Sequence, residues 1–264
     1  MVDHTPLREL AARLAREAGT LAREGRRAVT SALAGDTKSS NTDMVTEFDR
    51  AAEAHIVGEL RRRRPDDTIV GEEGTDDTGT SEYAWFIDPI DGTTNFVYDQ
   101  PAWACSIGVS HAGEMVVGAV YVPVLDELFL ATRGEGATRN GERITVSGQI
   151  ELALALVGTG FTYQREARAE QAAVVTSLIG DVRDIRRLGS AAFDMCMVAC
   201  GRLDVYYERY LNSWDAAAGE LIAREAGAIS SDFSGGAPHP DELVVATPAI
   251  HGPFLRLLKG VDAV

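Results

Sequence analysis

The stretch "WFIDPIDGTTNF", residues 85–96, places an apolar run directly before two aspartates, Asp88 and Asp91. The apolar run predicts a buried strand, and the "DPIDG" that ends it has the composition of a turn. A turn with ordinary capping aspartates is one interpretation. The chain already carries a formal net charge of -15, however, and neighbouring buried carboxylates need a compensating partner.

Acidic side chains also stand at the ends of other predicted elements. Glu72 follows the strand "TIV" of "TIVGEEG", and Asp49 and Asp215 each open a predicted helix. Side chains beyond strand ends and at helix starts commonly converge on the mouth of a site. We therefore expect these carboxylates to meet, which weakens the interpretation of a simple turn.

A cluster of carboxylates predicts a bound cation, because like charges raise one another's pKa unless positive charge lies among them. Oxygen ligands at varied spacing suit Mg²⁺, and no His or Cys lies close to these motifs to favour zinc. An EF-hand needs acids at positions three and five and a Glu at twelve. Counted from Asp88, those positions hold Ile90, Gly92 and Asp99. Ile90 also excludes the D-x-D pattern of a phosphoaspartate enzyme, and the sequence contains no Walker A loop.

The composition restricts the class of protein. Hydrophobic residues make up 45% and charged residues 25%, as in ordinary globular proteins. Forty acidic residues against 25 basic ones argue against nucleic acid and anionic membranes as partners, and the run "RRRR" at 61–64 is interpreted as a solvated helix end. Cys105, Cys196 and Cys200 are too few for a disulfide scaffold and predict core packing.

The N-terminus predicts an amphipathic helix rather than a signal peptide. No uncharged stretch reaches the roughly 20 apolar residues that a membrane span needs. We therefore expect a cytoplasmic protein.

The first half of the chain predicts two helices followed by an antiparallel sheet. The helices are expected at Pro6–Leu33 and at Thr46–Arg64, the second with Thr46 as its N-cap. "HAGE" at 111–114 predicts a hairpin, and "GEGATRNGERI" at 134–144 is interpreted as a surface turn that closes the sheet. The predicted strands are Thr68–Gly71, Ala84–Asp88, Trp103–His111, Glu114–Tyr121 and Glu127–Arg133.

From about Glu151 the pattern changes to alternating strand-like and helix-like runs, which predicts an α/β second half. We therefore expect two closely packed sub-domains. Residues 1–148 would form an α+β unit with most of the metal ligands, and residues 149–264 an α/β unit that contributes Asp215 and substrate contacts. The predicted runs are Ala153–Gly158, Glu166–Ile179, Val182–Arg187, Ala191–Cys200, Leu203–Glu208, Trp214–Ala226, Ala228–Ser231, Leu243–Ala246 and Pro248–Leu258.

Several of these segments resemble the inositol monophosphatase family. "GEEG" (71–74), the opening stretch and "WDAAAGELIAREAGA" (214–228) resemble its signatures, while "GTGF" (158–161) with "RRLGSAA" (186–192) is most similar to the bacterial inositol-1-monophosphatase type. The resemblance runs over nearly the whole chain. It implies a layered α-β-α-β-α sugar-phosphatase fold, a homodimer, and a lithium-sensitive, Mg²⁺-dependent phosphomonoesterase.

The resemblance also implies a set of metal ligands. Glu72, Asp88 and the carbonyl of Ile90 would hold a first Mg²⁺ ion. Asp88, Asp91 and Asp215 would hold a second ion, and a third, weaker one would depend on Glu72 and water.

By the same resemblance, Thr93 and Asp49 would orient and deprotonate the attacking water, with Glu72 as a further catalytic residue. The backbone N–H groups of Gly92 and Thr93 would bind the phosphate, and Lys38 would reach the water network at the metals from a mobile loop. The implied contacts to the alcohol are Asp91, Ser190, Ala191, Glu208 and Asp215.

The implied reaction is hydrolysis of myo-inositol 1-phosphate by a metal-activated water, without a phosphoenzyme. Histidinol phosphate, fructose 1,6-bisphosphate and 3'-phosphoadenosine 5'-phosphate remain alternative substrates, because the metal motif does not separate them. Glu208 favours a polyol, whereas an inward-pointing Arg209 would favour a second anionic group. A non-catalytic interaction protein on the same fold is a further alternative, which the loss of a metal ligand or of Thr93 would signal.

The aromatic residues near these motifs are expected to serve packing. Trp85, Trp103 and Trp214 are predicted in the core or behind the site. Of the two tyrosines before Glu208, only one can share its face, because neighbouring residues of a strand alternate.

Overall fold

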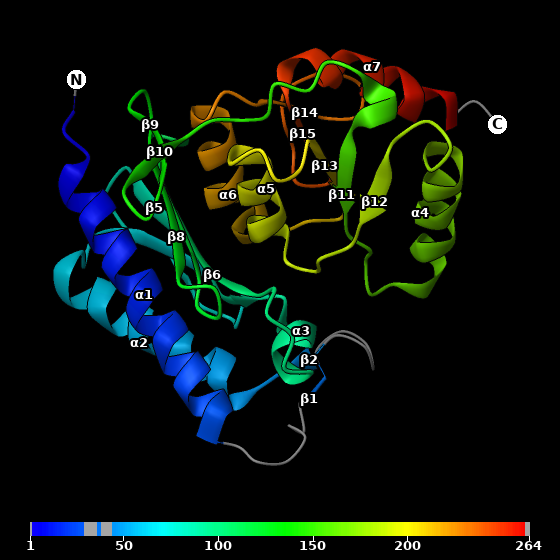
Figure 1. Ribbon diagram of the computed structural model, residues 1–264. Helices are drawn as coiled ribbons and strands as arrows, with labels where there is room; N and C mark the ends of the chain where they lie inside the picture. The colour runs from blue at the N-terminus through cyan, green and yellow to red at the C-terminus, as the bar shows by residue number, and fades with distance from the viewer. Residues whose placement is uncertain (1, 29–35, 38–43, 262–264) are drawn as a thin grey trace.

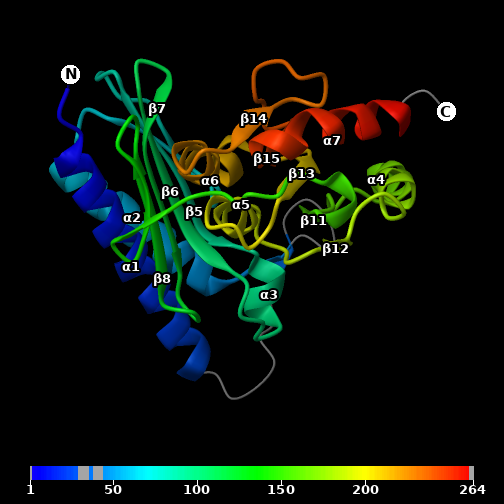
Figure 2. The ribbon, with the colours of Figure 1, turned by 45° about the horizontal axis from the view of Figure 1, so that its top comes forward.

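The described part of the chain folds into five layers in the computed structural model, which describes residues 2–28, 36–37 and 44–261 (Figure 1). The helices are α1 (Thr5–Ala28), α2 (Glu47–Arg63), α3 (Thr93–Val97), α4 (Arg165–Leu178), α5 (Ala191–Ala199), α6 (Ser213–Glu225) and α7 (Pro248–Val261), with a 3₁₀ turn at Leu152–Leu154. Helices α1 and α2 cover the outer face of a first sheet, and α4 and α7 cover the outer face of a second. Helices α5 and α6 lie between the two sheets in both views (Figure 2). The predicted α-β-α-β-α layering is confirmed.

The first sheet has eight strands in the order β10-β9-β8-β7-β6-β5-β3-β4. All neighbours pair antiparallel except β3 and β5, which run parallel. Its strands are β3 (Thr68–Gly71), β4 (Asp76–Asp77), β5 (Tyr83–Asp91), β6 (Ala104–His111), β7 (Glu114–Val122), β8 (Glu127–Thr132), β9 (Gly136–Arg139) and β10 (Glu142–Ile144). The parallel pair matters for function, because the carboxyl ends of both strands then meet at one edge.

The interpretation of residues 134–144 as a surface turn is wrong. These residues form the hairpin of β9 and β10, in which Arg139 pairs with Glu142. Its two-residue loop has positive φ at both positions, 51° at Asn140 and 83° at Gly141, which is the geometry of a type I′ turn.

The second sheet has five strands in the order β12-β11-β13-β15-β14. The strands β12, β11 and β13 are parallel, and β15 pairs antiparallel with both β13 and β14. Its strands are β11 (Leu156–Thr159), β12 (Asp184–Arg186), β13 (Val205–Arg209), β14 (Ile229–Ser231) and β15 (Glu242–Ala246). A small separate sheet pairs β1 (Asp36–Thr37) with β2 (Met44–Val45).

Helix α6 lies unusually close to the first sheet, because two glycines pair across β6 and β7 beneath it. Gly108 lies opposite Gly118, and a Cβ at these positions would lie 2.6 Å from Cβ of Ala217 and 2.7 Å from the carbonyl oxygen of Ala218, respectively. Small residues on both surfaces therefore allow the close approach. The contact fixes the start of α6, which carries Asp215, against the sheet that carries Asp88.

One apolar core includes residues from both halves of the chain, among them Phe129 of β8, Phe193 and Cys196 of α5 and Leu221 of α6. The division into sub-domains near residue 148 stays a prediction. Cys105 and Cys196 are buried, in line with the expected core packing. In the part of the chain that the structure describes, no helix is both long and apolar enough to cross a membrane.

Candidate active site

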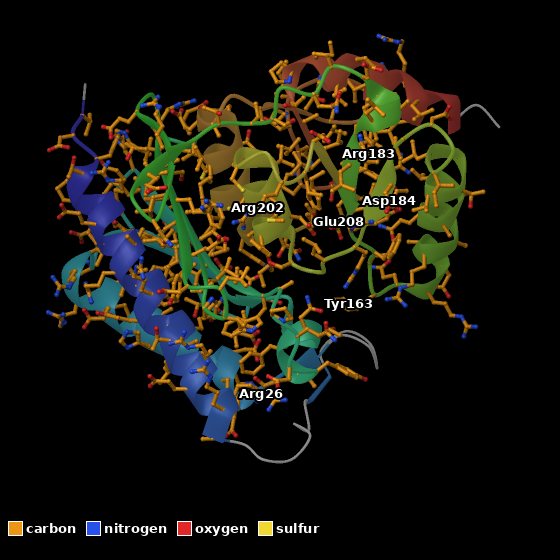
Figure 3. All side chains as sticks on the ribbon, viewed as in Figure 1. Arg26, Tyr163, Arg183, Asp184, Arg202 and Glu208 are labelled. Atoms are coloured by element: carbon orange, nitrogen blue, oxygen red, sulfur yellow. The ribbon has the colours of Figure 1, made fainter. Side chains whose placement is uncertain are left out.

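A cavity of about 490 Å³ lies where the two sheets and the middle helices meet. Its lining includes Tyr163, near α3, and Glu208, on β13, both labelled in Figure 3. The acidic residues of its lining are Glu72, Asp88, Asp91, Asp194, Glu208 and Asp215. Carboxylates predicted from separate segments of the sequence thus share one cavity.

Asp88 and Asp91 reach the cavity from the same strand because β5 contains an irregularity between them. Residues three apart on a regular strand point to opposite faces. Here the register with β6 shifts between Asp88 and Asp91, and such a bulge redirects the following side chain. Pro89 falls inside this irregular segment, where a missing N–H is tolerated. Oδ1 of Asp88 accepts a 3.0 Å hydrogen bond from the N–H of Ile90, which fixes the local turn.

Glu72 lies beside Asp88 because β3 and β5 are parallel. Gly71, the last residue of β3, is the register partner of Ile87, so Glu72 follows the strand end next to Asp88, which is still paired with Ser106 of β6. The N–H of Glu72 donates to the carbonyl of Ile87 at 3.1 Å.

Thr93 and Asp49 form the predicted pair. The hydroxyl of Thr93 lies 3.2 Å from Oδ1 of Asp49 and 3.2 Å from the carbonyl oxygen of Ile90. Asp49 is fully buried in the first turn of α2. Its other oxygen accepts hydrogen bonds from the N–H and the hydroxyl of Thr46, the N-cap residue, in a capping box. The capping box thus holds the carboxylate toward Thr93.

Gly92 starts α3 with φ at 94°. This left-handed conformation favours glycine, and a Cβ there would also lie 2.9 Å from the carbonyl oxygen of Gly189. The N–H groups that follow Gly92 open a helix, where they have no acceptor within that helix. Because Gly92 and Thr93 both line the cavity, N–H groups at this helix start could donate to an anion there.

Asp91 connects the first sheet to α5. Its Oδ2 accepts hydrogen bonds from the hydroxyl of Ser190 at 2.6 Å and from the N–H of Ala192 at 2.7 Å. Its Oδ1 accepts from the N–H of Ala191 at 3.2 Å. The carboxylate therefore lies at the N-terminus of α5, where the helix dipole favours negative charge.

Asp215 stands in the first turn of α6, as predicted, and lines the cavity. Its Oδ2 accepts a 2.6 Å hydrogen bond from the N–H of Asn212, and the two residues form a capping box. Glu208 reaches the cavity from β13 and accepts a hydrogen bond from the hydroxyl of Tyr206. Tyr207 points to the other face and packs on Phe254, so the predicted alternation is confirmed.

Burial and mutual repulsion raise the pKa of several of these carboxyls. Burial raises the pKa of Asp88 well above its usual value, and the charges of Glu72, Asp91 and Asp215 add to this. Burial, followed by the charge of Asp91, does the same to the pKa of Asp215. Asp91 reaches a pKa of only about 6, because burial is opposed by its hydrogen bonds from α5. The cluster is therefore unfavourable without compensating positive charge.

The donor set fits a hard divalent cation. All the donors are oxygens, and a cation among them would remove the repulsion that raises the pKa of Asp88. Among the described residues, no group of three or more His, Cys, Asp or Glu is already close enough to hold a metal ion. Since like charges repel, metal binding would require these side chains to move toward the ion.

Several residues of the lining were not predicted from the sequence. Asp194 is 1% exposed, and its Oδ1 has no hydrogen-bond partner among the described residues. Burial raises the pKa of Asp194 well above its usual value and that of Glu208 to about 7, and the charge of Arg187 opposes both rises. Outside the lining, the side-chain amide of Asn95 donates to the carbonyls of Ala102 and Leu188 and so connects α3 to the segment before α5. The position of Arg187 in "RRLGSAA", three residues before Ser190, was the one available signal.

Two expectations on tryptophans are confirmed and a third needs correction. Trp85 and Trp103 are buried. Trp214 lines the cavity, and its indole N–H is buried with no partner in the described part of the chain. It stands directly before Asp215 at the start of α6, so the same turn brings both residues to the cavity.

Arg209 does not line the cavity. It lies over the ring of Phe233 and pairs with Glu242 at 3.0 Å, since it alternates with Glu208 along β13. This placement removes the argument for a second anionic group on the substrate. Lys38 lies outside the described residues.

Comparisons with known proteins agree with this fold. The chain matches the model of the inositol monophosphatase family over residues 3–261. It is 44% identical over 279 residues to inositol-1-monophosphatase SuhB of Mycobacterium tuberculosis, covering 97% of this chain and 95% of the relative. It is 43% identical over 260 residues to Nus factor SuhB of Pasteurella multocida, covering 96% of each. The crystal structure of extragenic suppressor protein suhB from Bartonella henselae superposes with a TM-score of 0.91 at 32% identity, covering 97% of this chain and 99% of that one.

The five layers and the acidic cavity at the carboxyl ends of β3 and β5 define the layered sugar-phosphatase fold. Within that class, the chain belongs to the inositol monophosphatase family.

Proposed function

We propose that this protein hydrolyses a phosphate monoester, first of all myo-inositol 1-phosphate, with the help of two or three Mg²⁺ ions. One observation carries the proposal. The carboxylates of Glu72, Asp88, Asp91 and Asp215 line the cavity that also contains Glu208 and the hydroxyl of Thr93. The carboxylates proposed to bind metal and the Glu208 proposed to bind the alcohol thus line one cavity of about 490 Å³, which supports binding of a small substrate.

Glu72, Asp88 and the carbonyl of Ile90 would hold the first ion, and Asp88, Asp91 and Asp215 the second. A third ion would depend on Glu72 and water. When bound, Mg²⁺ would neutralise phosphoryl oxygens, acidify a coordinated water and stabilise the leaving alkoxide.

The chain's own residues orient the attacking water. Asp49 is held by Thr46 and accepts a hydrogen bond from the hydroxyl of Thr93. The oxygen of Thr93 can then accept a hydrogen bond from a water in the cavity, and Asp49 is the base that takes the proton through Thr93. The N–H groups of Gly92 and Thr93 would hold the phosphate in line with this water.

Glu208 would bind the alcohol. A carboxylate accepts hydrogen bonds from ring hydroxyls, and Tyr206 keeps the side chain of Glu208 in the cavity. Asp91 and Asp215 would contribute further acceptors. The hydroxyl of Ser190 and the N–H of Ala191 already donate to Asp91. Their proposed contacts with the substrate would be made in addition to these hydrogen bonds.

The names of the relatives do not agree on one activity, since one is an inositol-1-monophosphatase and another a Nus factor. Hydrolysis is favoured here because every proposed metal ligand and Thr93 are present. A non-catalytic interaction protein is the alternative.

The cytoplasmic location stays a prediction, and we also propose a homodimer, which analytical ultracentrifugation would test.

The decisive experiment assays phosphate release from myo-inositol 1-phosphate, histidinol phosphate, fructose 1,6-bisphosphate and 3'-phosphoadenosine 5'-phosphate. Each is measured with Mg²⁺, with added Li⁺ and with a chelator, on the wild-type protein and on Asp88→Asn. We expect the highest kcat/KM for inositol phosphate, inhibition by Li⁺, and near loss of turnover in Asp88→Asn. Turnover that persists in Asp88→Asn or in the chelator would contradict the metal assignment, and no turnover of any ester would favour the non-catalytic alternative.

A further inference from the structure

A buried carboxylate outside the cavity holds the segment that carries Glu72. Glu53, in the middle of α2, is 4% exposed. Its Oε2 accepts a 2.8 Å hydrogen bond from the N–H of Glu73, and its Oε1 accepts from the hydroxyl of Thr75 at 2.7 Å and from the N–H of Thr75 at 3.2 Å. Both of its oxygens are thus committed to the segment directly after Glu72.

The same segment closes on itself around this carboxylate. The N–H of Gly71 donates to the carbonyl of Thr75 at 2.7 Å, and Gly74 has φ at 108°. A Cβ on Gly71 would lie 2.5 Å from Oε2 of Glu53. The turn of residues 71–75 therefore wraps the carboxylate closely, and Gly71 leaves the room for it.

This anchoring limits where Glu72 can lie. On one side, its N–H is bonded to Ile87 of β5. On the other side, the N–H of Glu73 donates a hydrogen bond to Oε2 of Glu53. The backbone of Glu72 is thus held between the strand that carries Asp88 and a fixed point on α2.

Helix α2 presents a second carboxylate one turn earlier. Asp49 and Glu53 are four residues apart and therefore lie on one face of the helix. Asp49 accepts from Thr93, and Glu53 accepts from the turn after Glu72. One rigid helix thereby sets the relative positions of the group that orients the water and of a proposed metal ligand.

We propose that Glu53 is a positioning residue that sets the affinity of the metal site through Glu72. The inference rests on the proposed function, because it takes Glu72 as a ligand of the first ion. Glu53 would not touch metal or substrate. It would act as residues behind metal ligands do, whose loss typically weakens metal binding by about 10–100-fold.

The test is the dissociation constant for Mg²⁺, measured by calorimetry on the full-length protein. Glu53→Gln keeps the volume and one acceptor oxygen, so that the fold is retained. Glu59→Gln is the matched control, because Glu59 is on the same helix but bonds Arg13, Arg62 and Arg63 outside the cavity. Glu72→Gln and the double variant Glu53→Gln/Glu72→Gln complete a cycle.

We expect Glu53→Gln to weaken Mg²⁺ binding by about tenfold or more and Glu59→Gln to leave it unchanged. In the background of Glu72→Gln, the residual affinity should not fall further, because two residues that act through one contact are not additive. A purely structural role would lower the melting temperature without changing metal affinity. Wild-type affinity in Glu53→Gln, or a full additional loss in the double variant, would overturn the inference.

The cycle separates this inference from the proposed function. Wild-type Mg²⁺ binding by Glu72→Gln would refute the metal site itself, and the role of Glu53 with it. Weak binding by Glu72→Gln together with wild-type binding by Glu53→Gln would refute the positioning role alone.

Discussion

The hydroxyl of Ser190 donates a 2.6 Å hydrogen bond to Oδ2 of Asp91, which joins the start of α5 to the end of β5 across 99 residues of sequence. Two N–H groups of α5 donate to the same carboxylate. A proposed metal ligand is therefore also the anion at a helix N-terminus. Burial still raises the pKa of Asp91, but these hydrogen bonds limit the rise to about 6, whereas burial and then the charges of its acidic neighbours raise the pKa of Asp88 well above its usual value.

Ser190→Ala should destabilise the fold. The hydroxyl donates to Asp91 and also accepts from the N–H of Phe193 as the N-cap of α5. Loss of an N-cap that also bonds a buried carboxylate should lower the free energy of unfolding by about 1–2 kcal/mol. Urea denaturation measures this, with Thr176→Ala as the control, because the hydroxyl of Thr176 donates to the carbonyl of Ala172 within an exposed helix turn. Equal stability of Ser190→Ala and the wild type would refute the claim that this hydroxyl stabilises both Asp91 and the start of α5.

Asp88→Asn should stabilise the metal-free protein while it removes activity. Asp88 is 2% exposed, and its pKa is raised by burial and then by three acidic neighbours. An uncharged amide ends that repulsion. In a chelator the melting temperature of Asp88→Asn should therefore exceed that of the wild type. Saturating Mg²⁺ should raise the wild-type melting temperature much more than that of the variant, since a ligand stabilises by its affinity for the folded state. A lower melting temperature of Asp88→Asn in the chelator would contradict this account.

Local pattern was sufficient for most elements. The predicted strand Thr68–Gly71 coincides with β3, and the predicted helix Thr46–Arg64 differs from α2 by one residue at each end. The layering came from resemblance to a family, because periodicity cannot say which sheet a helix covers. The hairpin at 134–144 was missed although Asn140 and Gly141 form the strongest short hairpin signal.

The site was only partly accessible from sequence. Turn chemistry and element ends indicated Asp88, Asp91 and Asp215. The meeting of Asp88 with Asp91, however, depends on a register shift inside β5 that no local pattern shows. Asp194 reads as an ordinary helical residue in "AAFDMC". Only the packing of α5 between two sheets brings it to the cavity, and that arrangement is a property of the whole chain.

Gly160→Ala should impair substrate recognition without unfolding the protein. A Cβ on Gly160 would lie 1.9 Å from Oε2 of Glu208. The clash is with the end of a flexible side chain, so Glu208 can move away and the backbone need not change. We expect a KM for inositol phosphate raised by about tenfold, as for one or more lost hydrogen bonds, with kcat changed less.

The control for this change is Gly58→Ala, because a Cβ on Gly58 would meet no atom within 4 Å. It should leave KM unchanged and slightly stabilise α2, where alanine is favoured over glycine. An unchanged KM in Gly160→Ala would show that Glu208 does not bind the alcohol. A phosphate ester with a small alcohol provides a second check, since its KM should respond little.

Asp67→Asn should cost stability in a pH-dependent way. Asp67 is 5% exposed and accepts hydrogen bonds from Arg64 at 2.7 Å, from the indole of Trp85 at 2.8 Å and from Ser81 at 2.7 Å. Burial acts to raise its pKa, but these bonds outweigh burial and hold the pKa below the ordinary 3.8. A folded-state pKa below the unfolded one means that the contribution is complete above pH 3.8 and is lost as the pH falls through the lowered value.

The difference in unfolding free energy between wild type and Asp67→Asn should therefore be about 2–3 kcal/mol at neutral pH, and it should shrink below pH 3.8. Urea denaturation at a series of pH values measures this difference. Asp184→Asn is the control. Asp184 lies on β12 (Figure 3), and its ion pair with Arg186 is exposed, so removal of this pair should leave the unfolding free energy nearly unchanged. A difference for Asp67→Asn that stays constant with pH would show that the stabilisation comes from the shape of the side chain rather than from its charge.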